Sequence, residues 1–439
     1  MRKISILIKH SGEETVKQLL QTPYYRIYVL IEEGTEIPKS LSNRVIFFSY
    51  KREHHRNGII KKLISDKPRE LIIPFFRGDS YSQYAIHTRN QYSNKNIDWK
   101  IFKYKHKMNE FVGSEKKAIF LLHDTLSTTS YNDIKKTLWE DTFIVKPINK
   151  SASAWAFKIA NHHDWEQIQS KLLPCDHVIE EYYPWHLHSV DFYFDGEHVL
   201  VLCIVKEMPF IEIMDENKHS EEFLLAYGEE INKHFLYFLP IRYDIPYNKM
   251  SDTERKLLSD LWKKLKSIGY KWFIHVEYKF NPITKKVGFI ERWARMGWQR
   301  SDWIKRLHYF DIKELLYDIH SGDISKWKSY KWSYIFKNIV PNMHYIGIYK
   351  NFLKKTSIGE IISSHKNYME ISFQQYIINY FKSLWIVVNN LHIMTSGNKK
   401  DFYPSYQWKS IFKVLFEVDD DNFKKLKSKK IQIIEKLVF

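Results

Sequence analysis

The segment from residue 272 to residue 295 reads WFIHVEYKFNPITKKVGFIERWAR, and it says more about the fold than any other part of the sequence. Two apolar runs, residues 272–280 and 287–292, flank an Asn-Pro turn signal, so the segment predicts an antiparallel hairpin. One glutamate interrupts each arm, Glu277 the first and Glu291 the second. Their separation of 291 − 277 = 14 residues fits two strands and a tight connection, which would bring the two carboxylates face to face.

Facing carboxylates suit magnesium, a hard cation that takes oxygen ligands and the phosphates of ATP. The simpler interpretation of the isolated pair is two acids that face solvent on an edge hairpin. His275 shares a strand face with Glu277 and would orient that acid, touch phosphate or be a core histidine. Arg292, Arg295 and Arg300 follow closely, and arginines beside a metal–phosphate site clamp a carboxylate or an acyl phosphate.

The sequence before this hairpin predicts an α+β domain. Strands are expected at residues 141–146, 178–181, 189–194 and 198–206, the last two joined by an Asp-Gly turn. Helices are expected at residues 116–122, 164–172 and 253–268, the last capped by Ser251 or Asp252.

Three segments of this domain carry residues that suit a nucleotide. Lys146 ends an apolar strand, where a buried ammonium needs a partner such as a phosphate oxygen unless the side chain leaves for solvent. Small residues that include Ser151 and Ser153 follow, and they either let backbone N–H groups approach phosphates or form an ordinary turn. Glu180 and Glu181 close another strand, where acids bond an adenine amino group or orient a lysine; paired glutamates are also common on surfaces.

The first hundred residues alternate short apolar runs with helical patterns. Strands are expected at residues 4–8, 25–31, 45–49 and 71–75, and helices at 14–21 and 59–65. This alternation is typical of an open α/β sheet. The sequence has no G-x-G-x-x-G motif, so it does not indicate a dinucleotide site.

Composition narrows the class of protein. The 439 residues with 44% hydrophobic content predict two or three domains, and the two cysteines form no CxxC motif. No stretch approaches the roughly 18 apolar residues of a membrane span, so we expect a cytoplasmic protein with no membrane partner. The formal charge of +17 is spread along the chain without a nucleic-acid-binding signature, which favours a solvated basic surface over a nucleic-acid partner.

The order of these features resembles the ATP-grasp superfamily over residues 108–310, most closely the amino-acid and peptide carboxylate–amine ligases. The resemblance implies an N-terminal open α/β domain (1–107), a two-lobed grasp domain (108–310, with a mobile lobe at about 142–206) and a small C-terminal α/β or β-rich lobe (311–439). It also implies ATP and Mg²⁺ as cofactors, and carboxylate and amine substrates that are small molecules or peptides. A homodimer is compatible with the resemblance.

The resemblance also implies roles for individual residues. Lys146, together with Lys116 or Lys117, matches the nucleotide-binding lysines; Glu180, Glu181 and Tyr182 match the adenine strand and hinge; and Lys206 would face the nucleotide. Glu277 and Glu291 match the magnesium ligands, and Arg295, with Arg300 nearby, matches the arginine that holds the substrate or its phosphate.

The sequence departs from the family pattern at three places. Trp293 stands where the pattern has a metal-binding asparagine, Ala154 or Trp155 where it has a glycine, and Leu187 where it has an acid that often contacts ribose. We therefore expect either a divergent ligase that works through an acyl phosphate or a degenerate grasp fold that acts as a binding or scaffold subunit. A metal site built from His186 and His188 with His162-His163, and a nucleic-acid-binding role, are further alternatives.

Overall fold

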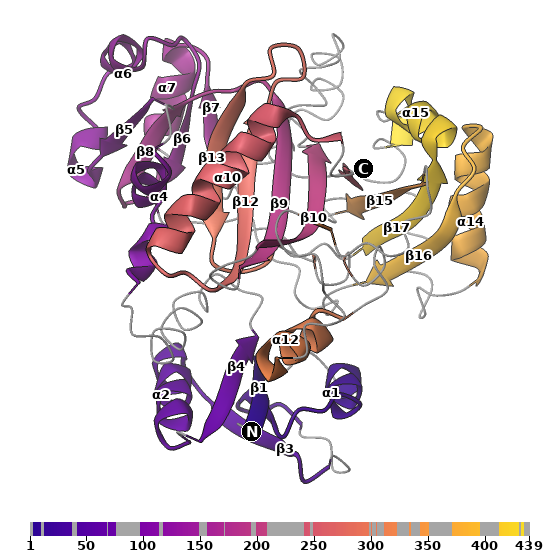
Figure 1. The fold of residues 1–439 in the computed structure, drawn as a ribbon. Helices are drawn as coiled ribbons and strands as arrows, with labels where there is room; N and C mark the ends of the chain where they lie inside the picture. Colours follow the sequence, from indigo (N-terminus) through magenta and orange to yellow (C-terminus); the bar gives the residue numbers. More distant parts are fainter. Residues whose placement is uncertain are drawn as a thin grey trace.

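In the computed structural model, the described residues form three β-sheets (Figure 1). The structure describes residues 3–9, 13–36, 42–67, 69–75, 97–113, 117–148, 156–170, 172–194, 199–208, 241–245, 249–297, 300, 304, 311–322, 333–334, 343–350, 371–395, 412–429 and 432–433. Lys116, the segment with Ser151, Ser153, Ala154 and Trp155, and the Asp-Gly turn at 195–196 lie outside the described residues.

The N-terminal sheet is open and parallel, as the alternation of strands and helices predicts. Its strands are β1 (Lys3–Lys9), β2 (Ile27–Glu32), β3 (Val45–Tyr50) and β4 (Glu70–Phe75), in the order β3-β2-β1-β4. The helices are α1 (Glu13–Leu20) and α2 (Glu53–Ser65), and α2 begins six residues before the predicted helix. The middle residues of β1 and β2 are all buried, because a parallel sheet is covered on both faces.

The second sheet forms a small lobe of its own. It has the order β5-β8-β6-β7, from β5 (Ala118–Leu121), β8 (His177–Glu181), β6 (Phe143–Pro147) and β7 (Phe157–Ile159). Its helices are α5 (His123–Leu126), α6 (Tyr131–Leu138) and α7 (His162–Gln169). A separate apolar core, which includes Phe143, Trp165 and Ile179, holds this lobe together.

The predicted helix at residues 116–122 is wrong, because residues 118–121 form β5. Ile119 and Leu121 pack against the core of the small lobe, whereas Ala118 and Phe120 are exposed. This alternation has the period of two that a strand requires, and pairing with β8 satisfies the backbone.

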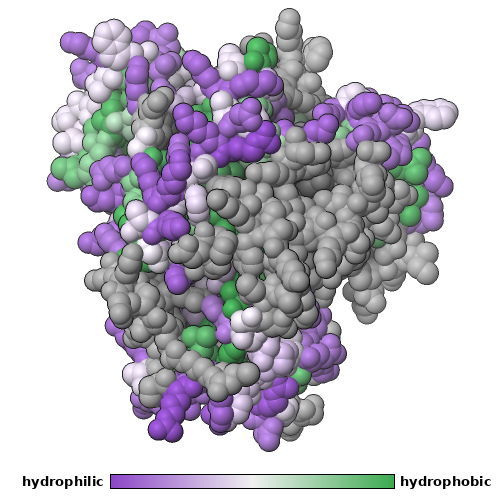
Figure 2. Space-filling model, viewed as in Figure 1, coloured by the Kyte–Doolittle hydropathy of each residue, from purple (hydrophilic) through white to green (hydrophobic). Residues whose placement is uncertain are grey.

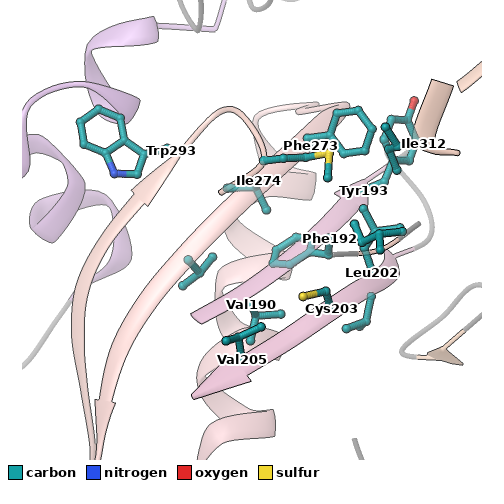
Figure 3. Close-up of a cluster of buried hydrophobic side chains, with 14 of the residues drawn as sticks. Val190, Phe192, Tyr193, Leu202, Cys203, Val205, Phe273, Ile274, Trp293 and Ile312 are labelled. Carbon is teal, nitrogen blue, oxygen red and sulfur yellow. The ribbon is translucent and has the colours of Figure 1, made fainter. Parts of the chain in front are cut away.

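The large sheet has the order β13-β12-β9-β10-β11-β15-β17-β16, and β14 (Ser333–Tyr334) pairs with β10. Its predicted hairpins are both present: β9 (His186–Phe194) with β10 (Val199–Met208), and β12 (Trp272–Phe280) with β13 (Val287–Trp293). Residues of β9, β10 and β12 pack with Ile312 into the largest core cluster (Figure 3). The predicted mobile lobe at 142–206 is therefore divided between two sheets, and we place its boundary near residue 182.

The C-terminal strands extend the large sheet. They are β15 (Met343–Lys350), β16 (Asn389–Thr395) and β17 (Phe412–Asp419), and β11 (Ile241–Asp244) joins them to β10. Two helices, α14 (Ile371–Ser383) and α15 (Asp420–Ser428), lie beside these strands (Figure 1), and the Asp419 side chain caps α15.

A helix that follows the second hairpin in the sequence contacts the N-terminal sheet. α12 (Ile312–Ser321) reaches the N-terminal domain, where the Tyr24 hydroxyl donates to the Lys313 carbonyl at 2.7 Å. α10 (Asp252–Ser267) starts with a capping box between Ser251 and Glu254, which confirms the predicted cap. Polar residues cover much of the visible described surface (Figure 2). Within the described ranges, no helix combines the length and apolar character that crossing a membrane would require.

Candidate functional site

Glu277 and Glu291 face each other across the second hairpin, as their spacing predicts. They are paired in the register of β12 and β13, next to a β-bulge between Glu277 and Tyr278. Glu291 is buried, and the Glu277 side chain keeps 21% of its surface exposed. Burial and then the nearby Glu291 carboxylate raise the pKa of Glu277, because the two negative charges repel each other. A cation between the carboxylates would relieve that repulsion.

Glu291 is held by side chains on both of its oxygens. The Lys105 ammonium lies 3.5 Å from Oε2, and the Trp293 indole N–H donates to Oε1 at 2.9 Å. The Lys105 ammonium and the Arg295 guanidinium lie 5.6 and 5.4 Å from the centre of the Trp293 ring. Trp293, which stands in place of a metal-binding asparagine, therefore donates a hydrogen bond to Glu291, one of the two acids expected to bind the metal.

Lys105, which was not predicted from the sequence, interacts with residues of both the large sheet and the small lobe. It begins α4 (Lys105–Val112), which follows the short helix η2 (Trp99–Phe102), and its side chain is buried. Burial lowers its pKa, while Glu291 and Glu180 favour the charged form and Lys146 opposes it. Lys105 therefore lies within electrostatic reach of the small lobe and of the hairpin.

The small lobe contributes Lys146 and Glu180 to this region. The Lys146 ammonium lies 2.6 Å from Oε2 of Glu180, and Asn109 of α4 donates to Oε1 at 3.1 Å. Glu180 therefore orients Lys146, one of the two roles that the sequence suggested for the paired acids. Lys117, in contrast, is exposed just before β5.

The signal for Lys105 was present but weak. Lys105 and Met108 are the buried residues of α4 and lie three residues apart, on one face of the helix. A lysine on an apolar helix face is a candidate for a buried partner.

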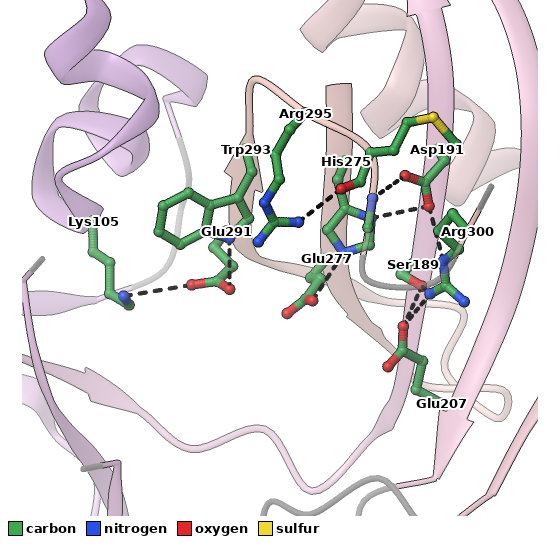
Figure 4. Close-up of polar contacts among 12 residues, drawn as sticks. Lys105, Ser189, Asp191, Glu207, His275, Glu277, Glu291, Trp293, Arg295 and Arg300 are labelled. Carbon is green, nitrogen blue, oxygen red and sulfur yellow. Dashed lines mark hydrogen bonds and ion pairs between the residues drawn. The ribbon is translucent and has the colours of Figure 1, made fainter. Parts of the chain in front are cut away.

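His275 connects the hairpin acids to a buried network. Its Nδ1 lies 3.0 Å from Asp191 Oδ2, and its Nε2 lies 3.0 Å from Glu277 Oε1 (Figure 4). Burial opposes protonation of the ring, but Asp191 and Glu277 outweigh it and raise the pKa of His275 to about 9. Both ring nitrogens therefore carry protons at neutral pH, and His275 orients Glu277, one of the roles expected for it.

Arg300 and Arg295 hold different positions in this region. Arg300 is buried, donates from Nε to Asp191 at 3.0 Å and from Nη2 to Ser189 at 2.5 Å, and pairs with Glu207 of β10. Arg295 is only partly buried and donates to the Met296 carbonyl at 2.9 Å. Arg300 is engaged inside the protein, whereas Arg295 lies beside the hairpin acids.

The remaining predicted residues lie on the strands nearby. Glu181 accepts a bond from the Tyr183 hydroxyl, and the Tyr182 N–H donates to the Thr142 carbonyl at 3.3 Å. The Tyr183 and Trp185 rings stack with centres 4.4 Å apart. Lys206 is buried on β10, opposite His188 in the register of β9.

The histidines outside this network do not form the alternative metal site. His188 bonds to Glu254 at 2.8 Å, His163 to Gln167 at 2.7 Å, and His162 lies 3.5 Å from Glu166. Among the described residues, the group of histidine and acid side chains with metal-ligand spacing is Glu207, His275 and Glu277.

The geometry brings Lys105, Lys146 and two facing carboxylates to the place where the small lobe meets the hairpin. Lysine ammonium groups bind phosphate oxygens, and paired carboxylates bind a hard divalent cation. The arrangement suits a polyphosphate with its metal ion.

Comparison with known proteins gives structural similarity without sequence similarity. No protein-family model matches the chain, and no curated protein matches its sequence. An L-amino acid ligase from Bacillus licheniformis superposes with a TM-score of 0.61 at 10% identity, over 99% of this chain and 98% of that one.

Two further solved structures show the same similarity. An N5-carboxyaminoimidazole synthetase from Staphylococcus aureus, complexed with ADP, has a TM-score of 0.58 at 12% identity, over 98% of this chain and 96% of that one. A biotin carboxylase–ATP analogue complex from Campylobacter jejuni has a TM-score of 0.56 at 13% identity, over 100% and 92%. At these identities the comparisons establish the fold of the chain.

Proposed function

From the ATP-grasp fold that this chain adopts, we propose that it is an ATP-dependent carboxylate–amine ligase. The observation that carries the proposal is the convergence of Lys105, Lys146, Glu277 and Glu291 at the meeting of the two grasp lobes. Similarity to an L-amino acid ligase over nearly the whole length of both chains supports the same reading of the fold. Fold alone does not fix function, which depends on the chemistry of the site residues.

The lysines would hold the phosphates of ATP. Lys146 is oriented by Glu180, and Lys105 sits between that pair and Glu291. Two ammonium groups held by carboxylates are preorganised for anionic oxygens, because their positions are fixed before the nucleotide arrives. The strand end at Glu181 and Tyr182 would receive the adenine.

The hairpin acids fit a magnesium ion. Glu277 and Glu291 are in register, both offer oxygen atoms, and their mutual repulsion raises the pKa of Glu277. When bound, Mg²⁺ would neutralise phosphate charge and polarise the γ-phosphate. Trp293 offers no oxygen ligand, so its N–H instead fixes the orientation of Glu291.

The reaction would follow two displacements. A carboxylate oxygen of the substrate attacks the γ-phosphorus, forming the acyl phosphate and releasing ADP. The amine nitrogen then attacks the acyl carbon, inorganic phosphate leaves, and the amine loses a proton. Arg295, beside the hairpin acids and partly exposed, is the residue we assign to the acyl phosphate or the substrate carboxylate.

Thermal unfolding with and without MgATP tests the nucleotide site. ATP at about 100 times its Kd should stabilise the wild-type chain by about 2.7 kcal/mol. Lys146→Ala and Glu291→Ala should remove most of that stabilisation. Lys263→Ala is the matched control, because Lys263 is exposed and pairs with Asp260 on α10.

A second assay tests the chemistry. Screening amino acids and peptides in pairs for phosphate release should identify a carboxylate and an amine that together stimulate ATP turnover. ATP binding without turnover for any pair would favour the alternative of a degenerate grasp fold that binds nucleotide as a subunit. The absence of any MgATP-induced stabilisation in the wild type would contradict the proposed nucleotide site.

A further inference from the structure

Glu277 belongs to a second group of ligand-type side chains besides its pair with Glu291. One atom each from Glu207, His275 and Glu277 lies within 4.8 Å of the other two. Glu207 comes from β10, whereas His275 and Glu277 come from β12 (Figure 4). We propose that Glu207, His275 and Glu277 form a binding site for a divalent cation that takes mixed nitrogen and oxygen ligands, with Mn²⁺ as its representative.

The spacing of the ligand atoms suits an octahedral ion. His275 Nε2 and Glu277 Oε1 lie 3.0 Å apart. Two ligands at right angles, each about 2.1 Å from an ion, lie about 3.0 Å from each other. A tetrahedral ion with bonds of similar length would require about 3.4 Å. A cation could therefore replace the proton between these atoms with little movement of either side chain.

The surroundings of the histidine match those of a metal ligand. Asp191 lies 3.0 Å from the opposite ring nitrogen, Nδ1, and is fixed in turn by the Gly297 N–H at 2.5 Å and by Arg300 at 3.0 Å. A histidine that binds a metal almost always donates its other ring N–H to a carboxylate or carbonyl group, which sets the tautomer and the orientation of the ring. Asp191 serves that purpose here, because it leaves Nε2 directed at Glu277.

Glu207 is also held in place by neighbouring side chains. Ser189 donates to its Oε1 at 2.6 Å, and Arg300 forms an ion pair with the same oxygen. Within the described part of the chain, His275 is the only side chain that the structure bonds to the Glu277 carboxylate. Two of the three ligands are thus held by residues outside the group, and the third points at the histidine.

The local charge favours a cation. Asp191, Glu207, Glu277 and Glu291 give four carboxylates, and once the ion has displaced the Nε2 proton of His275, the cations paired with them are Arg300 and Lys105. A divalent ion would balance the two remaining negative charges. An imidazole ligand favours transition ions over magnesium, so this site should prefer Mn²⁺ to Mg²⁺.

Manganese alone, without nucleotide, tests the site on the full-length chain. Free Mn²⁺ measured by electron paramagnetic resonance should show one bound ion, and magnesium should compete at least about tenfold less well. The bound ion should show nitrogen coupling from one imidazole. His275→Gln and Glu207→Gln should each weaken binding by about tenfold or more, within the range seen when metal-site residues are changed.

The control is His188→Gln. His188 is also a buried histidine of the large sheet and also bonds to a glutamate, Glu254, but it belongs to no ligand group. This variant should bind Mn²⁺ as the wild type does. Equal loss in His188→Gln and His275→Gln, or bound Mn²⁺ without nitrogen coupling, would overturn the proposal, and the coupling in the wild type decides the question even if a variant fails to fold.

The Mn²⁺ site and the proposed ligase site share Glu277, but separate experiments test them. Failure of MgATP to stabilise the chain would remove the proposed ligase site while leaving Mn²⁺ binding intact. Loss of Mn²⁺ binding with a normal MgATP response would remove the second site alone.

Discussion

The Lys105 ammonium lies 3.5 Å from Oε2 of Glu291, although the two residues are 291 − 105 = 186 positions apart in the sequence. The neighbouring residue of the hairpin strengthens the same junction. Arg292 donates to the Ile101 carbonyl at 3.2 Å, and its guanidinium lies 4.0 Å from the centre of the Phe111 ring. Both ends of α4, and η2 before it, are thereby fixed against the hairpin that carries both acids.

Replacing Lys105 should impair nucleotide binding. Lys105→Met keeps most of the length of the side chain but removes the charge between Glu291 and the Lys146–Glu180 pair. We expect MgATP affinity to fall at least about tenfold, which corresponds to about 1.4 kcal/mol. Isothermal titration calorimetry with a non-hydrolysed ATP analogue and magnesium measures this affinity.

Lys117→Met is the control for this change. Lys117 is exposed ahead of β5, so its removal should leave the affinity within about twofold. A larger loss from Lys117→Met than from Lys105→Met would show that Lys117, and not Lys105, contacts the nucleotide.

Trp293→Phe should destabilise the chain through Glu291. The substitution keeps an aromatic ring but removes the N–H that donates to a buried carboxylate. Hydrogen bonds to charged groups contribute about 1.5–3 kcal/mol, so we expect a loss of that size in the free energy of unfolding measured with urea.

Trp165→Phe provides the comparison. Trp165 is equally buried, but its N–H donates to the neutral Thr129 carbonyl at 2.9 Å, for which the expected loss is about 0.5–1.5 kcal/mol. Only Trp293→Phe should also change the magnesium concentration needed for the MgATP-induced stabilisation. If both variants shift it equally, Trp293 has no particular link to Glu291.

Gly297→Ala should displace His275. A Cβ atom at Gly297 would lie 2.6 Å from Cε1 and 2.7 Å from Nδ1 of the imidazole, closer than such contacts allow. Either the imidazole or the Gly297 backbone must shift, and both contact Asp191, so we expect a destabilisation of about 1–3 kcal/mol together with weaker Mn²⁺ binding.

Gly58→Ala, in the middle of α2, is the matched glycine. A Cβ there meets nothing within 4 Å, and alanine suits a helix interior better than glycine by roughly 0.5–1 kcal/mol. Urea unfolding should therefore give changes of opposite sign. Stabilisation by Gly297→Ala would show that the imidazole moves at no cost.

Stability should fall as the pH drops below about 6.5. Burial lowers the pKa of His188, an effect that Glu254 only partly offsets, and burial likewise lowers the pKa of His177. Below the unfolded-state value of about 6.5, the unfolded chain takes up protons that the folded chain does not. The loss should reach at most about 1.4 kcal/mol per pH unit for each histidine, measured by urea unfolding between pH 7 and pH 5.

His177→Gln should make this slope shallower. His177 donates from Nδ1 to the Cys175 carbonyl at 2.7 Å, a bond that a glutamine amide can replace. His275 acts with the opposite sign in a different window: its pKa of about 9 contributes stability that is complete below pH 6.5 and lost as the pH rises through 9. A flat profile between pH 7 and pH 5 would contradict the assignment of His188 and His177 as neutral.

Local sequence patterns were sufficient to predict most strands of the two hairpins of the large sheet and of the N-terminal sheet. The register of Glu277 with Glu291 followed from two apolar arms and one turn, because side chains alternate along each strand with a fixed period. The cap of α10 followed from Ser251 and Glu254 for a similar reason, since a capping box is contained within four residues. The helix predicted at residues 116–122 rests on a short apolar run that carries no clear period, whereas pairing with β8 makes residues 118–121 a strand.

The sequence by itself determined the fold class, the facing acids of the hairpin and Lys146 as a strand-end cation, because each depends on neighbours a few residues away. The tertiary structure alone decided which lysine meets Glu291, that β9 and β10 leave the small lobe for the large sheet, and that Glu207 joins His275 and Glu277. The residues next to Lys105 and Glu207 in the sequence do not indicate which side chains these two residues contact. Their positions are set by how separate sheets and helices pack, and that packing depends on long-range burial rather than on any single segment.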